Sequence, residues 1–256
     1  MRALSTILLA LVLGANAAPP QAQPSKAADL AVRGKSLSLH LYGPPDGEPV
    51  VVSSGDGGWM HLGPHAANVL ARAGFFVVGV DSKQYLSVFT SGKATLRVED
   101  VPGDYRVIVD FASRRSRTRP ILVGVSEGGG LSVLAATDPR LRSVIRGVVG
   151  LGLPDINELG WRWSDSVIYV TKGIPNEPTF SVKSIVDRIA PLPLAAIHAT
   201  HDEFVSLPQI RAIMARARDP KRLWILEGAD HRFSDNERQF DKTLLEAMAW
   251  VAANAR

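Results

Sequence analysis

The chain has 256 residues, 46% of them hydrophobic, and a formal net charge of +4 at pH 7. These values suit one globular domain with a sizeable core. The sequence has no cysteine, which excludes disulfide bonds, thiolate metal sites and a cysteine nucleophile. The mild basicity favours peripheral contact with an anionic membrane surface, and nothing in the sequence indicates a nucleic-acid-binding module.

The first residues have the pattern of a secretory signal. A short basic start precedes an apolar run, and a small-residue cleavage motif ends at Ala17, which predicts a signal peptide over 1–17. The apolar run is shorter than the roughly 20 residues that a membrane span needs. We therefore expect a periplasmic or secreted protein, with a flexible lead-in over 18–30 and a single domain over 31–256.

Apolar runs alternate with amphipathic stretches through the rest of the chain. Strands are expected over 36–41, 50–53, 75–80, 120–125, 147–151, 194–199 and 222–226. Helices are expected over 64–72, 101–114, 129–137, 207–217 and 238–253. This alternation predicts an α/β fold with a mostly parallel central sheet and helices on both faces.

A glycine-rich loop, Ser54-Gly55-Asp56-Gly57-Gly58-Trp59, follows the strand at 50–53. Its glycines would let the main chain approach a ligand closely. The backbone N–H of Asp56, or that of Gly57 instead, is a candidate donor to an oxyanion. Gly57 and Trp59 are candidate substrate contacts, although a residue such as Trp59 more often serves packing than ligand binding.

The segment after the strand at 120–125 contains a Gly-x-Ser-x-Gly pattern, Gly124 to Gly128, followed by an expected helix. This is the strand–turn–helix arrangement of the nucleophile elbow in α/β-hydrolases, and it makes Ser126 the candidate nucleophile. The backbone N–H of Glu127, the next residue, is the expected first oxyanion donor.

The segment 154–189 interrupts the alternation. It contains two tryptophans, several Ser and Pro residues and little periodicity. We interpret it as a short cap-like insertion that helps to shape a substrate pocket. The alternative is surface packing, in which the tryptophans cover an exposed sheet edge.

The other two candidate catalytic residues, an acid and a histidine, follow the last two expected strands. Asp202 follows the strand at 194–199, and His231 follows the strand at 222–226, so the order Ser, acid, His is that of the α/β-hydrolases. Glu203 and Asp230 are neighbouring carboxylates that compete with Asp202 for the role. Alternation along a strand points His198 away from its neighbour at position 201, so we expect no metal site there.

These residue types fit acyl transfer. A serine hydroxyl needs a base to take its proton, and a carboxylate holds the imidazole in the required tautomer. We expect Ser126 to attack, His231 to act as base and then acid, and Asp202 to orient it. No cofactor is expected.

The glycine-rich loop, the strand at 75–80 and the sequence Asp81-Ser82-Lys83-Gln84-Tyr85 resemble the VirJ/AcvB group of bacterial virulence proteins, which are α/β-hydrolase-like. The similarity extends from about residue 50 onward. It implies an exported serine hydrolase and, for AcvB-like members, cleavage of aminoacyl esters of phosphatidylglycerol. At the elbow the family has Phe-Gly-Ala-Asp after the serine, whereas this chain has Glu-Gly-Gly-Gly.

The expected function is cleavage of a small-molecule or lipid ester through an acyl-enzyme on Ser126. Two alternatives remain from the sequence: a non-catalytic periplasmic protein that binds a partner, and a peptidase of the same fold. The sequence does not determine the oligomeric state.

Overall fold

The computed structural model describes residues 26–163 and 177–255. The central strands are β1 (Lys26–Val32), β2 (Lys35–Tyr42), β3 (Glu48–Ser53), β4 (Phe75–Val80), β5 (Ile121–Val125), β6 (Gly147–Leu151), β9 (Leu194–Ala199) and β10 (Lys221–Leu226). The helices are α1 (Leu62–Arg72), α2 (Ser82–Val88), α3 (Asp100–Ala112), α4 (Glu127–Ala136), α5 (Pro139–Arg142), α7 (Leu207–Arg216) and α8 (Glu237–Asn254). A small second sheet consists of β7 (Ile156–Glu158) and β8 (Thr179–Ser181), and three 3₁₀ turns are η1 (Val182–Ser184), η2 (Val186–Ile189) and η3 (Ser234–Asn236).

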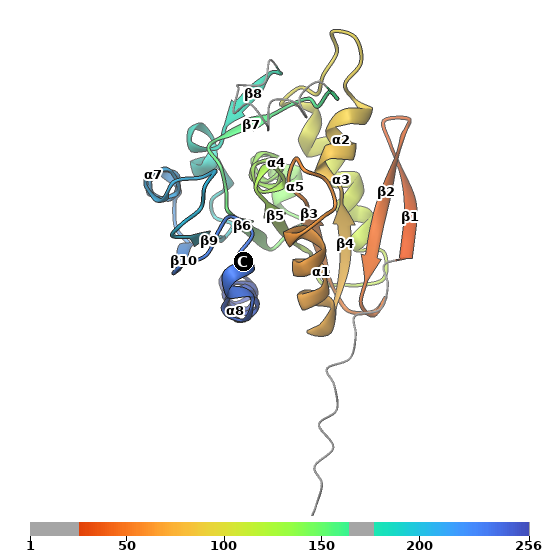
Figure 1. Cartoon of the computed structure of the whole chain (residues 1–256). Coiled ribbons are helices and arrows are strands. Elements are labelled where there is room, and N and C mark those ends of the chain that lie inside the picture. The colour runs from red at the N-terminus through yellow and green to blue at the C-terminus, as the bar shows by residue number, and fades with distance from the viewer. Residues whose placement is uncertain (1–25, 164–176, 256) are drawn as a thin grey trace, which may run out of the picture.

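The central sheet has eight strands in the order β1-β2-β4-β3-β5-β6-β9-β10. β1 and β2 are antiparallel, and the six strands from β4 to β10 are parallel to one another. The β1–β2 hairpin and β10 lie at opposite ends of the molecule (Figure 1). With helices on both faces, this is the α/β-hydrolase fold that the sequence predicts.

Two hydrophobic cores form because successive strand residues point to opposite faces. In β3, Val51 packs into the core that includes residues of α3, α4 and α7, whereas Val50 and Val52 pack into the core that includes residues of α1 and α8. All three side chains are fully buried. Near-continuous apolar runs are what a parallel sheet covered on both faces requires.

The edge strand β1 corrects one expectation. The flexible lead-in expected over 18–30 overlaps β1, which begins at Lys26 and pairs with β2 along its whole length. Leu30 and Val32 point into the core. Their alternation with polar and small residues suits an edge strand that is buried on one face only.

The expected strands and helices all form, with bounds that differ from the structure by at most two residues. The structure adds α2, α5 and the β7–β8 sheet. The carboxylate of Asp81 caps α2 by accepting the N–H of Gln84. β7 and β8 have three residues each and are too short for a periodic pattern.

Part of the expected insertion over 154–189 lies outside the described residues, from 164 to 176. The described part holds the β7–β8 sheet, which lies at the top of Figure 1, apart from the central sheet. Among the described helices, none is both long and apolar enough to cross a membrane.

Candidate active site

The loops at the carboxyl ends of the parallel strands enclose a pocket of about 480 Å³. Open α/β sheets gather their ligands at this edge. The pocket brings together Gly55, Asp56 and Gly57 after β3, Ser126 and Glu127 after β5, and His231 after β10. It also includes Pro154, Ile156 and Glu158, so the insertion shapes the pocket.

Ser126 lies in a strained turn between β5 and α4. Its φ is 47° and its ψ is −118°, an unfavourable conformation for a residue with a side chain. The turn is tight, since a Cβ atom at Gly124 would lie 2.3 Å from the Gly128 carbonyl oxygen, and one at Gly128 would lie 2.4 Å from the Ser54 carbonyl oxygen. The two flanking glycines are therefore a steric requirement of the turn.

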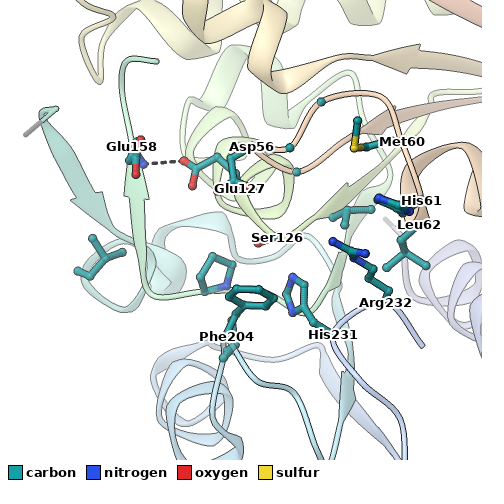
Figure 2. A pocket seen from close by; sticks show the side chains of 17 residues that line it. Asp56, Met60, His61, Leu62, Ser126, Glu127, Glu158, Phe204, His231 and Arg232 are labelled. Carbon is teal, nitrogen blue, oxygen red and sulfur yellow. Dashed lines mark hydrogen bonds between the residues drawn. The ribbon is translucent and has the colours of Figure 1, made fainter. Parts of the chain in front are cut away.

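His231 and Asp202 form a hydrogen-bonded pair. His231 Nδ1 lies 2.7 Å from Asp202 Oδ2, and the Asp202 side chain is only 1% exposed. A carboxylate accepts, so Nδ1 carries the proton and Nε2 is left free to accept one. His231 and Ser126 both line the pocket and are labelled in Figure 2.

The neighbouring carboxylates Asp202, Glu203 and Asp230 accept hydrogen bonds from different groups. The other oxygen of Asp202 accepts the backbone N–H groups of Phe204 and Val205, at 2.9 and 2.7 Å. Glu203 accepts the backbone N–H of His231 at 3.0 Å, and Asp230 accepts N–H and O–H groups of its own turn. Only Asp202 contacts the imidazole of His231 through a hydrogen bond.

Hydrogen bonds determine the charge of Asp202. Burial by itself would raise its pKa, but the His231 hydrogen bond and charge and the two backbone N–H groups outweigh burial and hold the pKa below its ordinary value. Asp202 is therefore ionised at neutral pH and suited to stabilise a protonated imidazole.

Gly152, just after β6, limits where His231 can lie. Its φ is +58°, and a Cβ atom there would lie 2.6 Å from His231 Cε1. No side chain fits between this backbone and the imidazole. The sequence analysis missed this position, for which the Gly-Leu-Gly-Leu-Pro sequence at the end of a strand is the available signal.

A group of three carboxyl side chains, which we call the carboxyl wall, lines the pocket: Asp56, Glu127 and Glu158. Glu127 is 6% exposed, and its Oε1 accepts the backbone N–H of Glu158 at 2.6 Å (Figure 2). Burial raises the pKa of Glu127 well above its ordinary value, and the charges of Asp56 and Glu158 raise it further. Burial also raises the pKa of Asp56.

The sequence predicted a role for the backbone of Glu127 and missed that of its side chain. The side chain lies in the pocket because β7 brings Glu158 against the start of α4. A Cβ atom at Gly130 would lie 1.9 Å from Oδ1 of Asn157, so α4 and β7 pack more closely than an alanine would allow. The run of glycines after Ser126 is the signal for this close approach.

Trp59 does not line the pocket. Its indole stacks on His40 with ring centroids 4.7 Å apart and donates a hydrogen bond to the Tyr42 hydroxyl. A Cβ atom at Gly79 would lie 2.3 Å from the Trp59 ring. These contacts assign Trp59 to packing, the alternative that the sequence analysis left open, whereas Gly57 does line the pocket.

The two histidines at the end of β9 differ in environment. His198 is fully buried and His201 is exposed. Nδ1 of His198 lies 3.9 Å from Asp202 Oδ2, too far for a hydrogen bond, and neither ring nitrogen has a partner among the described residues. Within residues 26–163 and 177–255, no group of three or more His, Asp or Glu side chains could hold a metal ion.

Comparisons with known proteins agree with this architecture. The family model described as bacterial virulence protein (VirJ) matches residues 48–251. No protein with a curated function matches the sequence significantly.

Solved structures show the same fold. Est1E from Butyrivibrio proteoclasticus superposes with a TM-score of 0.65 at 16% identity, covering 89% of this chain and 99% of its own. A dienelactone hydrolase from Anabaena variabilis gives 0.61 at 18% identity, with 90% and 98% covered. A membrane phospholipase A, described as a bacterial virulence factor, gives 0.59 at 13% identity, with 88% and 87% covered.

Proposed function

Because this chain belongs to the VirJ family of bacterial virulence proteins, we propose that it is a serine hydrolase that cleaves an ester through an acyl-enzyme on Ser126. The observation that carries the proposal is the 2.7 Å hydrogen bond between His231 and Asp202 in a pocket that also holds Ser126 in its strained turn. A binding scaffold would not need this combination.

The proposed reaction has two halves. Ser126 Oγ attacks the ester carbonyl carbon while His231 Nε2 takes the hydroxyl proton. The alcohol leaves with that proton, and the acyl group remains on Ser126. A water molecule then gives a proton to His231 and attacks the acyl carbon, which releases the acid and restores the Ser126 hydroxyl. Asp202 stays ionised throughout.

Two backbone donors are proposed to stabilise the oxyanion. The N–H of Glu127 belongs to the first residue of α4, where no acceptor within the helix is available. The second donor is the N–H of Asp56. A Cβ atom at Gly55 would lie 3.5 Å from the Cβ of Ser126, so the loop after β3 passes close to the nucleophile. Such donors are each worth about 3 kcal/mol in acyl transfer.

The carboxyl wall favours one class of ester over others. Carboxyl groups beside the nucleophile suit a substrate whose acyl part carries a cation, as the α-amino group of an aminoacyl ester does. We therefore propose an aminoacyl ester as substrate, with an aminoacylated phospholipid headgroup as the specific form that the family resemblance suggests. A small soluble ester is the broader alternative.

We also propose that the protein acts outside the cytoplasm. The support is the signal-like pattern over 1–17, which lies outside the described residues. Cell fractionation with an antibody to the protein tests this proposal separately, and recovery in the cytoplasmic fraction alone would contradict it.

Hydrolysis of p-nitrophenyl esters and labelling by a fluorophosphonate probe test the catalytic proposal. The wild-type protein should turn over the ester and become labelled at Ser126. Ser126→Ala should lose labelling and, with it, nearly all activity, by about 10⁴-fold or more. His231→Ala should lose activity to a similar extent. If the folded wild-type protein neither reacts with the probe nor hydrolyses soluble or aminoacyl-phospholipid esters, the partner-binding alternative replaces this proposal.

A further inference from the structure

The most exposed large apolar side chains of the described residues are concentrated at the pocket. Four such side chains are more than half exposed: Trp163 at 79%, Phe204 at 63%, Ile156 at 56% and Met60 at 53%. Three of these four line the pocket, and we call Met60, Ile156 and Phe204 the apolar rim. The remaining exposed apolar side chains of the described chain, such as Val107 and Leu245, are each only 37% exposed.

The apolar rim is assembled from separate parts of the chain. Met60 lies between β3 and α1, Ile156 in β7, and Phe204 between β9 and α7. Figure 2 shows Met60 and Phe204 on different sides of Ser126. Two loops and a short strand that each place an apolar side chain in water at the same opening make a surface rather than an isolated exposed residue.

We propose that the apolar rim docks the pocket entrance onto the surface of an anionic lipid bilayer. Burying an apolar side chain in an apolar phase is favourable in proportion to the area removed from water, so three exposed side chains at one opening would favour membrane binding. The rim is too small to insert deeply, and it suits side chains that enter the boundary between headgroups and acyl chains.

Charge favours a lipid surface over other occupants. The chain has a formal net charge of +4, and the exposed Arg232 lies at the pocket beside the rim. Basic residues near an anionic leaflet are attracted to its surface. The Glu127 carboxyl is recessed in the pocket, at 6% exposure, and the Asp56 and Glu158 side chains there are half-buried. An ester on a lipid headgroup would thus meet Ser126 without leaving the membrane.

The inference rests on the proposed function only in its choice of a lipid, because docking itself needs no catalysis. Binding is therefore measured on Ser126→Ala, which cannot consume the lipid. The protein is mixed with vesicles of phosphatidylcholine, or of phosphatidylcholine with phosphatidylglycerol, and the bound fraction is measured by flotation.

The decisive variant is Met60→Ser with Phe204→Ser. Its matched control is Val107→Ser with Leu245→Ser, two exposed apolar residues on α3 and α8 that do not line the pocket. We expect vesicles with phosphatidylglycerol to bind the parent protein, the rim variant to lose affinity about tenfold or more, and the control to bind as the parent does. Thermal unfolding checks that both variants stay folded.

Several outcomes would overturn docking by the rim. These are no binding of the parent protein to either vesicle, an equal loss in the control, or binding that depends on phosphatidylglycerol but not on the rim. Hydrolysis of a soluble ester by the protein with Ser126 intact is measured in parallel. Turnover without vesicle binding contradicts docking alone, and vesicle binding without turnover of any ester contradicts the proposed function alone.

Discussion

Two buried carboxyl groups at the candidate active site, Asp202 behind His231 and Glu127 in the pocket wall, have pKa values that are shifted in opposite directions. Asp202 has a pKa below its ordinary value, and Glu127 has a pKa well above it. Burial acts in the same direction on both. The difference lies in the neighbours: Asp202 accepts three hydrogen bonds, one of them from an imidazole, whereas Glu127 accepts one backbone N–H and faces two other carboxyls.

The number of hydrogen-bond donors near each group therefore decides the direction in which the pKa of a buried carboxyl shifts at this site. Where donors are abundant, a buried carboxylate stays charged and can support an imidazolium. Where donors are scarce and negative charges are close, the carboxyl keeps its proton to a higher pH than usual. The role of each carboxyl can be tested by substitution.

The largest effect is expected from Asp202→Asn. The amide preserves the shape but cannot hold His231 in the required tautomer, so kcat should fall by about 10⁴-fold with little change in KM. Steady-state kinetics on a soluble ester measure both constants. A loss below about tenfold would mean that Asp202 is not the orienting carboxylate of the reaction.

A smaller effect is expected where α4 meets β7. In Gly130→Ala the new methyl group would collide with Asn157, which is fully buried, and destabilise the fold by about 1 to 3 kcal/mol. Gly103→Ala is the matched control, because a Cβ atom there meets nothing within 4 Å and the change should stabilise α3 by about 0.5 to 1 kcal/mol. Urea unfolding measures both. Equal stability of the two variants would contradict the close approach that positions the carboxyl wall.

The carboxyl wall itself is tested by selectivity. Glu127→Gln keeps the shape and the hydrogen bond from Glu158 but removes the ionisable group. The ratio of kcat/KM for an alanine p-nitrophenyl ester over its uncharged isobutyrate analogue should fall about tenfold, as expected for the loss of one partly buried charge pair of about 1.4 kcal/mol. An unchanged ratio would remove the support for aminoacyl substrates while leaving the esterase proposal intact.

The smallest expected effect is on the way the stability of the fold depends on pH. Since the pKa of Glu127 is raised on folding, the folded state keeps this proton to a higher pH than the unfolded chain, and wild-type stability falls as the pH rises through the folded pKa. The Glu127→Gln variant has no carboxyl at this position, so it does not lose stability in this way as the pH rises. Near pH 4 the two proteins should melt together, and near pH 8 the variant should melt about 2 to 4 °C higher, which corresponds to about 1 kcal/mol. A variant that is less stable near pH 8 would contradict the raised pKa.

The sequence predicted the central sheet well because its strands are simple. β4, β6 and β9 have the predicted bounds, since each is a nearly continuous apolar run, broken in β9 only by the buried His198. Ser126, Asp202 and His231 could be nominated because each follows such a strand. Their position relative to the strands is a local property, and the parallel sheet then gathers them at one edge.

The parts that were missed depend on contacts between distant segments. Glu158 lies 31 residues after Glu127, and nothing local indicates that its backbone would bind that side chain. The apolar rim is likewise assembled from three separate segments, two loops and the strand β7. Trp59 is the opposite case, because the sequence made it a candidate pocket residue whereas the structure packs it elsewhere. Its ring fills the space left by Gly79 in β4.

The raised pKa of Glu127 also affects how a cationic substrate would bind. A cation that enters the carboxyl wall favours the ionised carboxylate, so binding would expel a proton into the solvent. The apparent affinity for a cationic ester would then increase with pH until Glu127 is ionised in the free protein as well. In calorimetry, the heat of binding to Ser126→Ala would vary with the ionisation enthalpy of the buffer, and the slope would count the protons released.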